Sequence, residues 1–108
     1  MKSLGLIEVE SVAAAVDALD LMCKAADVEF VTWERKLGGR LVTVIVEGQI
    51  SAVKAAVEAA GGAIKDLAAS AVIASPHSET QRMVELSASR ILKKQKLEEK
   101  SEKFLEEV

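Results

Sequence analysis

Two strand-like runs of apolar residues meet at a pair of glycines in the stretch WERKLGGRLVTVIVEG, which runs from Trp33 to Gly48. The β-branched and aromatic residues of segments 28–36 and 40–47 are typical of strands, and Gly38-Gly39 is typical of the turn between them. Basic residues flank the glycines on both sides. The stretch therefore predicts a β-hairpin with a short, charged loop, in which the backbone can approach an ion, a ligand or another chain.

The segments on either side of the hairpin alternate between strand and helix patterns. The expected elements are a strand over 4–9, a helix over 12–26, strands over 28–36 and 40–47, a helix over 50–67, a strand over 70–75 and a long helix from Ser78. Ser11 can cap the first helix, and Pro76 ends the last strand. The order βαββαβ with an extended C-terminal helix predicts an α+β, ferredoxin-like fold, with two helices on one face of an antiparallel sheet.

Three packing details follow from this scheme. Val16 and Cys23 fall on the apolar side of the first helix, so we expect both to be packed, and Cys23 to be an inert thiol. The pair Gly61-Gly62 is unfavourable inside a helix, which suggests that another segment packs closely there. The sheet is apolar on both faces, so the face without helices needs cover from the C-terminal helix or from a second subunit.

Composition excludes several classes of function. The chain has 108 residues and a formal charge of -3, which fits one domain and disfavours a nucleic-acid binder. A single cysteine cannot form an internal disulfide, which fits a reducing cytoplasm, and the N-terminus resembles neither a signal peptide nor a membrane span. We therefore expect no nucleic-acid partner and no membrane partner.

The inventory of reactive side chains is too small for catalysis. The chain has one histidine, no tyrosine and no asparagine, and it lacks the CxxC, HExxH and P-loop patterns. His77 follows Pro76 at the junction of a strand and a helix, where we expect it to be structural or exposed. The sequence thus predicts no enzyme activity, no catalytic residues, no metal and no cofactor.

We divide the chain into a core of residues 1–77, a docking helix over 78–92 and a charged helical or frayed tail over 93–108. The apolar stripe of the C-terminal segment is denser before Leu92 than after it. The tail is either a solvated helix or an assembly or cargo-docking helix that uses Leu97, Phe104 and Leu105.

An ordered set of short motifs resembles one family. The motifs are SLGLIE at 3–8, the alanine-rich helix 13–26 with Lys24, KLGG at 36–39, LVTVIVEG at 41–48 leading into AVKAA at 52–56, and VIASPH at 72–77. Their order and spacing resemble the bacterial microcompartment shell proteins that have a single BMC domain.

The resemblance implies a structural protein rather than an enzyme. It implies a homohexamer whose flat tiles pack with each other and with other shell proteins into a shell within the cytoplasm, around encapsulated enzymes. It also implies that Lys24 lies at the tile edge, where it donates to backbone carbonyls of a neighbouring tile. The residues that it places around a central pore for small metabolites are Lys36, Leu37, Gly38, Gly39 and Arg40.

This chain departs from the family pattern at three places. The segment 31–41 is one residue longer than usual, with the extra residue near Arg35, where a β-bulge could absorb it. Arg40 replaces a small residue, which favours an electropositive pore for anionic metabolites, with Lys36 or Arg35 adding to the charge. Ser75 and Gln49 replace residues that are charged in many members, so both positions are assigned to the tile edge with weaker edge contacts.

Two other readings remain open from the sequence. The first is a small oligomeric, ferredoxin-like regulatory or ligand-sensing domain that binds an anion at the Gly38-Gly39 loop. The second keeps the shell domain but makes the chain an accessory component, whose helix from Ser78 to Val108 binds cargo or caps the ring.

Overall fold

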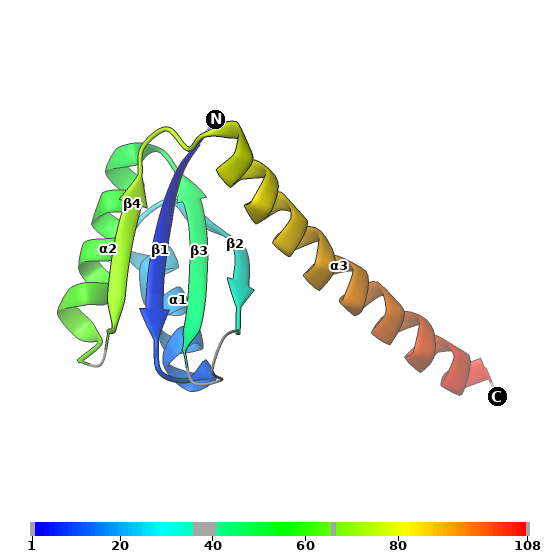
Figure 1. Cartoon of the computed structure of the whole chain (residues 1–108). Helices are drawn as coiled ribbons and strands as arrows, with labels where there is room; N and C mark the ends of the chain where they lie inside the picture. The colour runs from blue at the N-terminus through cyan, green and yellow to red at the C-terminus, as the bar shows by residue number, and fades with distance from the viewer. Residues whose placement is uncertain (1, 36–40, 66, 108) are drawn as a thin grey trace.

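A computed structural model describes residues 2–35, 41–65 and 67–107, apart from the side chains of Phe104 and Glu107. The elements are β1 (Ser3–Val9), α1 (Val12–Ala25), β2 (Val28–Glu34), β3 (Val42–Gly48), α2 (Ile50–Ala63), β4 (Ala69–Ile73) and α3 (Ser78–Glu107). The predicted ferredoxin-like α+β order with an extended C-terminal helix is confirmed. Helices α1 and α2 lie behind the sheet, and α3 projects away from it (Figure 1).

The four strands form an antiparallel sheet in the order β2-β3-β1-β4. The register pairs Leu6 of β1 with Ile45 of β3 on one side and with Ala71 of β4 on the other. Cross-strand partners share a face, so these three residues lie on the same side of the sheet. We call this side, which α1 and α2 leave uncovered, the open face.

The helix-covered face holds the core. Ala15, Ala18 and Met22 are the buried residues of α1, and Val53, Ala56, Val57 and Ala60 are those of α2. They pack against the inward-facing residues of the strands, which include Ile7, Val9, Val44 and Val46. The small residues of both helices allow the backbones to come close to the sheet and to each other.

Gly5 marks the closest approach of α2 to β1. A Cβ atom at this position would lie 2.8 Å from Val53 Cγ1, 3.0 Å from Val57 Cγ2 and 3.2 Å from Val46 Cγ2. Atoms at these distances overlap, so a larger residue would push α2 away from the central strand.

Some local expectations are confirmed and others are wrong. The Ser11 side chain accepts a hydrogen bond from the Ala14 N–H at 3.0 Å, so the predicted cap of α1 is present. Cys23 is exposed and Val16 is 60% exposed, because the arc of α1 that faces the sheet is centred on Ala15, Ala18 and Met22.

The prediction of close packing at Gly61-Gly62 is also wrong. The two glycines lie in the last turn of α2, and a Cβ at either position would have no neighbour within 4 Å. The helix ends at Ala63 rather than near residue 67, and β4 covers 69–73 rather than 70–75.

Among the described residues a β-bulge lies in β2, whereas the segment that follows Arg35, near which the extra residue is predicted, is outside the described residues. Phe30 pairs with Val46 and Thr32 pairs with Ile45, so Val31 is one extra residue on β2. This insertion reverses the alternation of side chains along the strand. Phe30 therefore shares the helix-covered face with Val46, whereas Thr32 and Glu34 share the open face with Ile45 and Thr43.

We predict opposite effects for alanine at two glycines. Gly5→Ala should lower the free energy of unfolding by about 1–3 kcal/mol, because its methyl group overlaps the valines of α2. Gly61→Ala should raise it by about 0.5–1 kcal/mol, because the site is open and helical. Thermal and denaturant unfolding of both variants beside the wild type measure the difference, and a Gly5→Ala variant as stable as the wild type would contradict the packing described.

Candidate functional site

The hairpin loop that carries the predicted pore residues lies between β2 and β3. Lys36, Leu37, Gly38, Gly39 and Arg40 lie outside the described residues, so their predicted role stays a prediction. Arg35 is described: its guanidinium carbon lies 6.0 Å from the centroid of the Trp33 ring. This distance is at the outer limit of a cation–π contact, so the exposed Arg35 charge lies beside Trp33 at the end of the strand.

Lys24 lies in the last turn of α1 and is exposed, as an edge residue must be. Its Nζ lies 2.8 Å from Asp20 Oδ2, one helical turn back. The hydrogen bond and the charge of Asp20 raise the pKa of Lys24 above its ordinary value, so the side chain stays protonated at neutral pH. An ammonium has three donors, so the contact with Asp20 leaves others for an acceptor on another chain.

Gln49 and Ser75, the other two predicted edge residues, lie close together. Both are exposed and line one surface depression of about 490 Å³, with Lys2, Ser3 and Ile50 among its other residues. The Ser3 hydroxyl donates to the Ala74 carbonyl at 2.7 Å, which fixes the segment that leads to Ser75. Gln49 precedes α2, and its side chain makes no capping hydrogen bond. The capping interaction therefore does not occupy its amide group.

The three predicted edge residues come from segments at the same end of the sheet. The register aligns Ser3, Gly48 and Val28 at this end, and the Asp27 carbonyl at the end of the α1–β2 connection approaches Gly48 closely. Glu34 and Val42, which flank the predicted pore loop, lie at the opposite end. The separation is visible in Figure 1, where β2 ends and β3 begins at the lower edge of the sheet.

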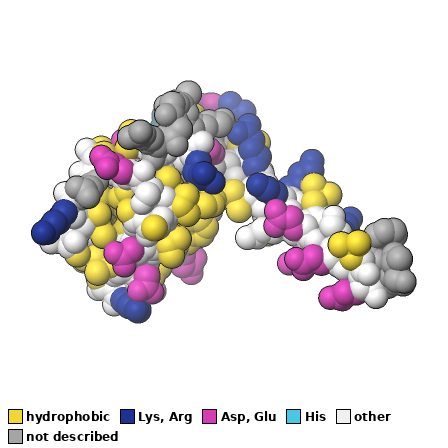
Figure 2. Space-filling model, turned by 90° about the horizontal axis from the view of Figure 1, so that it is seen from below, with side chains coloured by type: hydrophobic (Ala, Val, Ile, Leu, Met, Phe, Trp, Pro, Cys, Tyr) yellow, Lys and Arg dark blue, Asp and Glu magenta, His cyan; other side chains and the backbone are white. Residues whose placement is uncertain are grey.

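Two apolar depressions on the surface were not predicted from the sequence. One lies on the open face, has a volume of about 270 Å³ and is lined by residues of β1, β3 and β4, including Leu6, Thr43 and Ala71. The other, of about 250 Å³, lies between α1, β2 and α3 and includes Val16, Phe30, Trp33 and Ile91. Figure 2 shows hydrophobic side chains gathered on the side of the domain seen from below.

Among the described helices and strands, β2 is the one that α3 contacts. The Thr32 hydroxyl, which is fully buried, lies 2.7 Å from the Ser87 hydroxyl, and Ser87 also donates to the Glu34 carboxylate. The bulge at Val31 makes this contact possible, because it turns Thr32 and Glu34 toward the open face. A polar cluster on β2 therefore holds α3 at Ser87.

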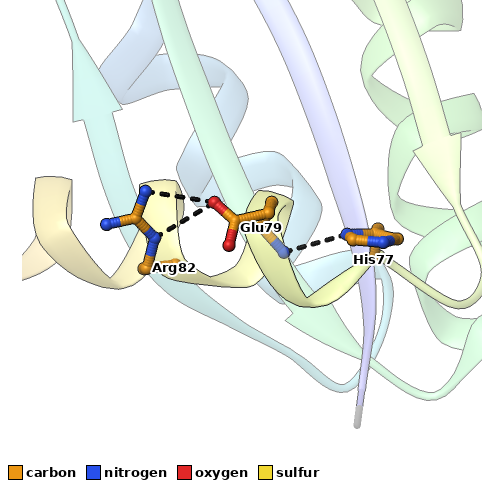
Figure 3. A network of polar contacts seen from close by, with 3 residues as sticks. All are labelled: His77, Glu79 and Arg82. Atoms are coloured by element: carbon orange, nitrogen blue, oxygen red, sulfur yellow. Dashed lines mark hydrogen bonds and ion pairs between the residues drawn. The ribbon is translucent and has the colours of Figure 1, made fainter.

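The start of α3 is fixed by short-range contacts (Figure 3). His77 Nδ1 accepts a hydrogen bond from the Glu79 N–H at 3.0 Å, so the imidazole caps the helix. Arg82 donates to Glu79 Oε2 from Nε at 3.2 Å and from Nη2 at 3.0 Å. His77 is exposed and structural, as predicted from its position after Pro76.

Within residues 2–35, 41–65 and 67–107 there is no group of three or more histidine, cysteine, aspartate or glutamate side chains that could hold a metal ion. None of the helices in the described part of the chain is long and apolar enough to span a membrane.

A family model matches most of the chain. The model described as BMC domain matches residues 3–76, so the chain belongs to the BMC-domain family. The resemblance identified from the sequence is thereby confirmed.

Individual relatives match over most of their length. The bacterial microcompartment shell protein PduA of Citrobacter freundii is 40% identical over 86 residues, which cover 77% of this chain and 91% of that protein. The carboxysome shell protein CsoS1C of Hydrogenovibrio crunogenus is 41% identical over 91 residues, which cover 81% of this chain and 88% of that protein.

A crystal structure of a microcompartment protein from Desulfitobacterium hafniense has a similar fold. Its TM-score is 0.69 and its sequence identity is 26%. The match covers 81% of this chain and 48% of that chain, so the present chain spans about half the length of that protein.

We predict that removing one partner from the polar cluster on β2 loosens α3. Ser87→Ala leaves the buried Thr32 hydroxyl without its close partner, which should cost about 1–3 kcal/mol. The double variant Thr32→Val/Ser87→Ala removes both hydroxyls and should recover most of this loss. Hydrogen exchange of the α3 amides and thermal unfolding measure both effects; equal losses in the single and double variants would contradict the role of the cluster.

Proposed function

We propose that the chain is a structural shell protein of a bacterial microcompartment within the cytoplasm. Its match to the BMC domain over residues 3–76 carries the proposal, because relatives that share this domain are named as shell proteins. In this role the chain is not an enzyme, and its partners are further copies of itself, other shell proteins and encapsulated enzymes.

The proposed assembly unit is a homohexameric tile with a pore on its axis. The predicted pore loop and the predicted edge residues Lys24, Gln49 and Ser75 come from opposite ends of one sheet, which supports a subunit with an inner and an outer end. The exposed residues of the open face and of the groove beside Phe30 provide apolar surface for subunit contacts. Ring closure needs two different patches on each subunit, and these surfaces lie on different sides of the domain.

The pore is proposed to favour anionic metabolites. Six Arg40 side chains, each about 6 Å from its neighbours in the ring, would repel by roughly 0.7 kcal/mol per neighbouring pair in bulk water and about 3 kcal/mol at an effective permittivity of 20. Such a ring lowers its energy by binding anions in transit. The Arg35 guanidinium lies beside Trp33, so in this proposal Arg40 and Lys36 supply most of the axial charge.

We predict that the purified chain has the mass of six copies. Native mass spectrometry measures this directly, since the mass of six copies of an 11.5 kDa chain is clearly different from the mass of two copies. A stable dimer would contradict the ring and would favour the small ligand-sensing domain that binds an anion at Gly38-Gly39.

We predict that Lys24→Ala weakens contacts between tiles but leaves the ring intact. The ammonium is exposed and charged, and its loss removes a donor from the edge. Electron microscopy should show fewer or smaller sheets, with an unchanged hexamer mass. Lys54→Ala is the matched control, because Lys54 is an exposed lysine of α2; an equal effect of both substitutions would argue against an edge role for Lys24.

We predict that Arg40→Gly lowers the flux of an anionic solute into assembled shells several-fold, because the positive field at the pore falls. The flux of a neutral solute of similar size is the control and should not fall. A rise in both fluxes would instead show that the arginine side chains occlude the opening.

A further inference from the structure

The part of α3 beyond Ile91 extends from the domain, and Gln95 is its one described residue that lines the depression beside α1 and β2. Ile91 is the last described residue of α3 that is not exposed, and the described side chains after it are exposed, including Leu92 at 54%, Leu97 at 58% and Leu105 at 71%. Residues 92–107 form about 24 Å of helix. Charged side chains of both signs and isolated hydrophobic ones cover this projection (Figure 2).

The charges of α3 from Arg90 onward are divided into two blocks. Residues 90–97 contain four basic side chains and no acidic one, a formal charge of +4. Residues 98–107 contain five glutamates and two lysines, a formal charge of -3. Among the described side chains, the ion pairs formed within the chain involve no residue beyond Arg82. The two blocks are therefore free to pair with another molecule.

Leu97, the apolar residue in the middle of the projection, lies outside the face that docks on β2. Ser87 and Ile91 mark the docked face. Leu97 lies ten positions after Ser87, which places it about 80° of arc away at a helical step of roughly 100° per residue. Leu86, which is 49% exposed, lies on the same side as Leu97, because eleven residues complete three helical turns almost evenly. This exposed face is available while α3 stays attached to β2.

We propose that the projecting half of α3 pairs in antiparallel orientation with the same segment of a second copy. In this arrangement the +4 block of each helix lies along the -3 block of the other, and the two Leu97 side chains meet near the centre. A parallel pair would instead place like charges together along the whole contact, and helix dipoles also favour the antiparallel arrangement. The pairing is a two-fold contact, so it joins two rings or two subunits in a way that ring closure does not.

The first test compares the full chain with a chain that ends at Leu92. The full chain should form a reversible species of twice the mass that the shorter chain reaches, measured by sedimentation. Raising the salt concentration from about 0.05 to about 0.5 M should lower the association constant for this doubling by about tenfold or more, because exposed charges are screened. Equal assembly of the two chains would overturn the proposal. The comparison is valid whatever the number of copies in the ring, so it is separate from the test of the proposed function.

The second test exchanges the charges. The variants Lys93→Glu/Lys94→Glu/Lys96→Glu and Glu99→Lys/Glu102→Lys/Glu106→Lys each give one sign to most of the helix, so each should lose the doubling on its own. Mixing the two variants should restore it, because each helix then faces the opposite charge. Loss in both variants without recovery in the mixture would overturn the proposal and would indicate a different partner, such as an encapsulated protein.

The third test fixes the orientation by disulfide formation, in a Cys23→Ser background because Cys23 is exposed. Leu97→Cys should link two copies. Ser101→Cys should not link with itself, since its two copies would be about 12 Å apart along the axis, but it should link with Lys94→Cys. Gln95→Cys, which points about 160° away from Leu97, is the control. Self-linking of Ser101→Cys as fast as that of Leu97→Cys would show a parallel pair and overturn the proposal.

Discussion

The close approach of α2 to β1 at Gly5 is the constraint on which the domain depends. Strand β1 lies inside the sheet and pairs with both β3 and β4, so its position fixes the other strands. Gly5 lets Val53 and Val57 of α2 lie directly on the strand backbone. With α2 seated there, Gln49 at its start is brought beside Ser3 and Ser75, and the depression that they share is formed.

Much of the fold could be predicted from the sequence because its signals are periodic. The alternation in β1, the Gly-Gly turn and the helical spacing of small apolar residues specify the order of the elements. The wrong details are those that periodicity does not decide. Val16 and Cys23 border the apolar arc of α1, and only the contact with the sheet selects which part of that arc is buried. The bulge at Val31 has no distinctive residue, since strand registers are set by the partner strand.

In the candidate site, too, some contacts could be predicted from the sequence and others could not. The pair of Asp20 and Lys24 has the i,i+4 spacing of a helical ion pair, and Trp33 and Arg35 have the i,i+2 spacing of neighbours on a strand, so both contacts had a signal in the sequence. The contact of Ser87 with Thr32 and Glu34 had none. It joins residues more than fifty positions apart, and it depends on a bulge that turns two polar residues toward α3. The role of Lys36, Leu37, Gly38, Gly39 and Arg40 rests on the family pattern alone.

In the proposed assembly, the length of the central strands sets the size of the subunit between its inner and outer ends. Strands β1 and β3 each have seven residues, which span about 23 Å between the end that carries the predicted pore loop and the end that carries Gln49 and Ser75. A subunit with this span fixes the distance from the axis of the ring to its rim. If the proposed tiles share one lattice with those of other shell proteins, that distance has to agree, so the strands would accept a change of length less readily than the loop or α3.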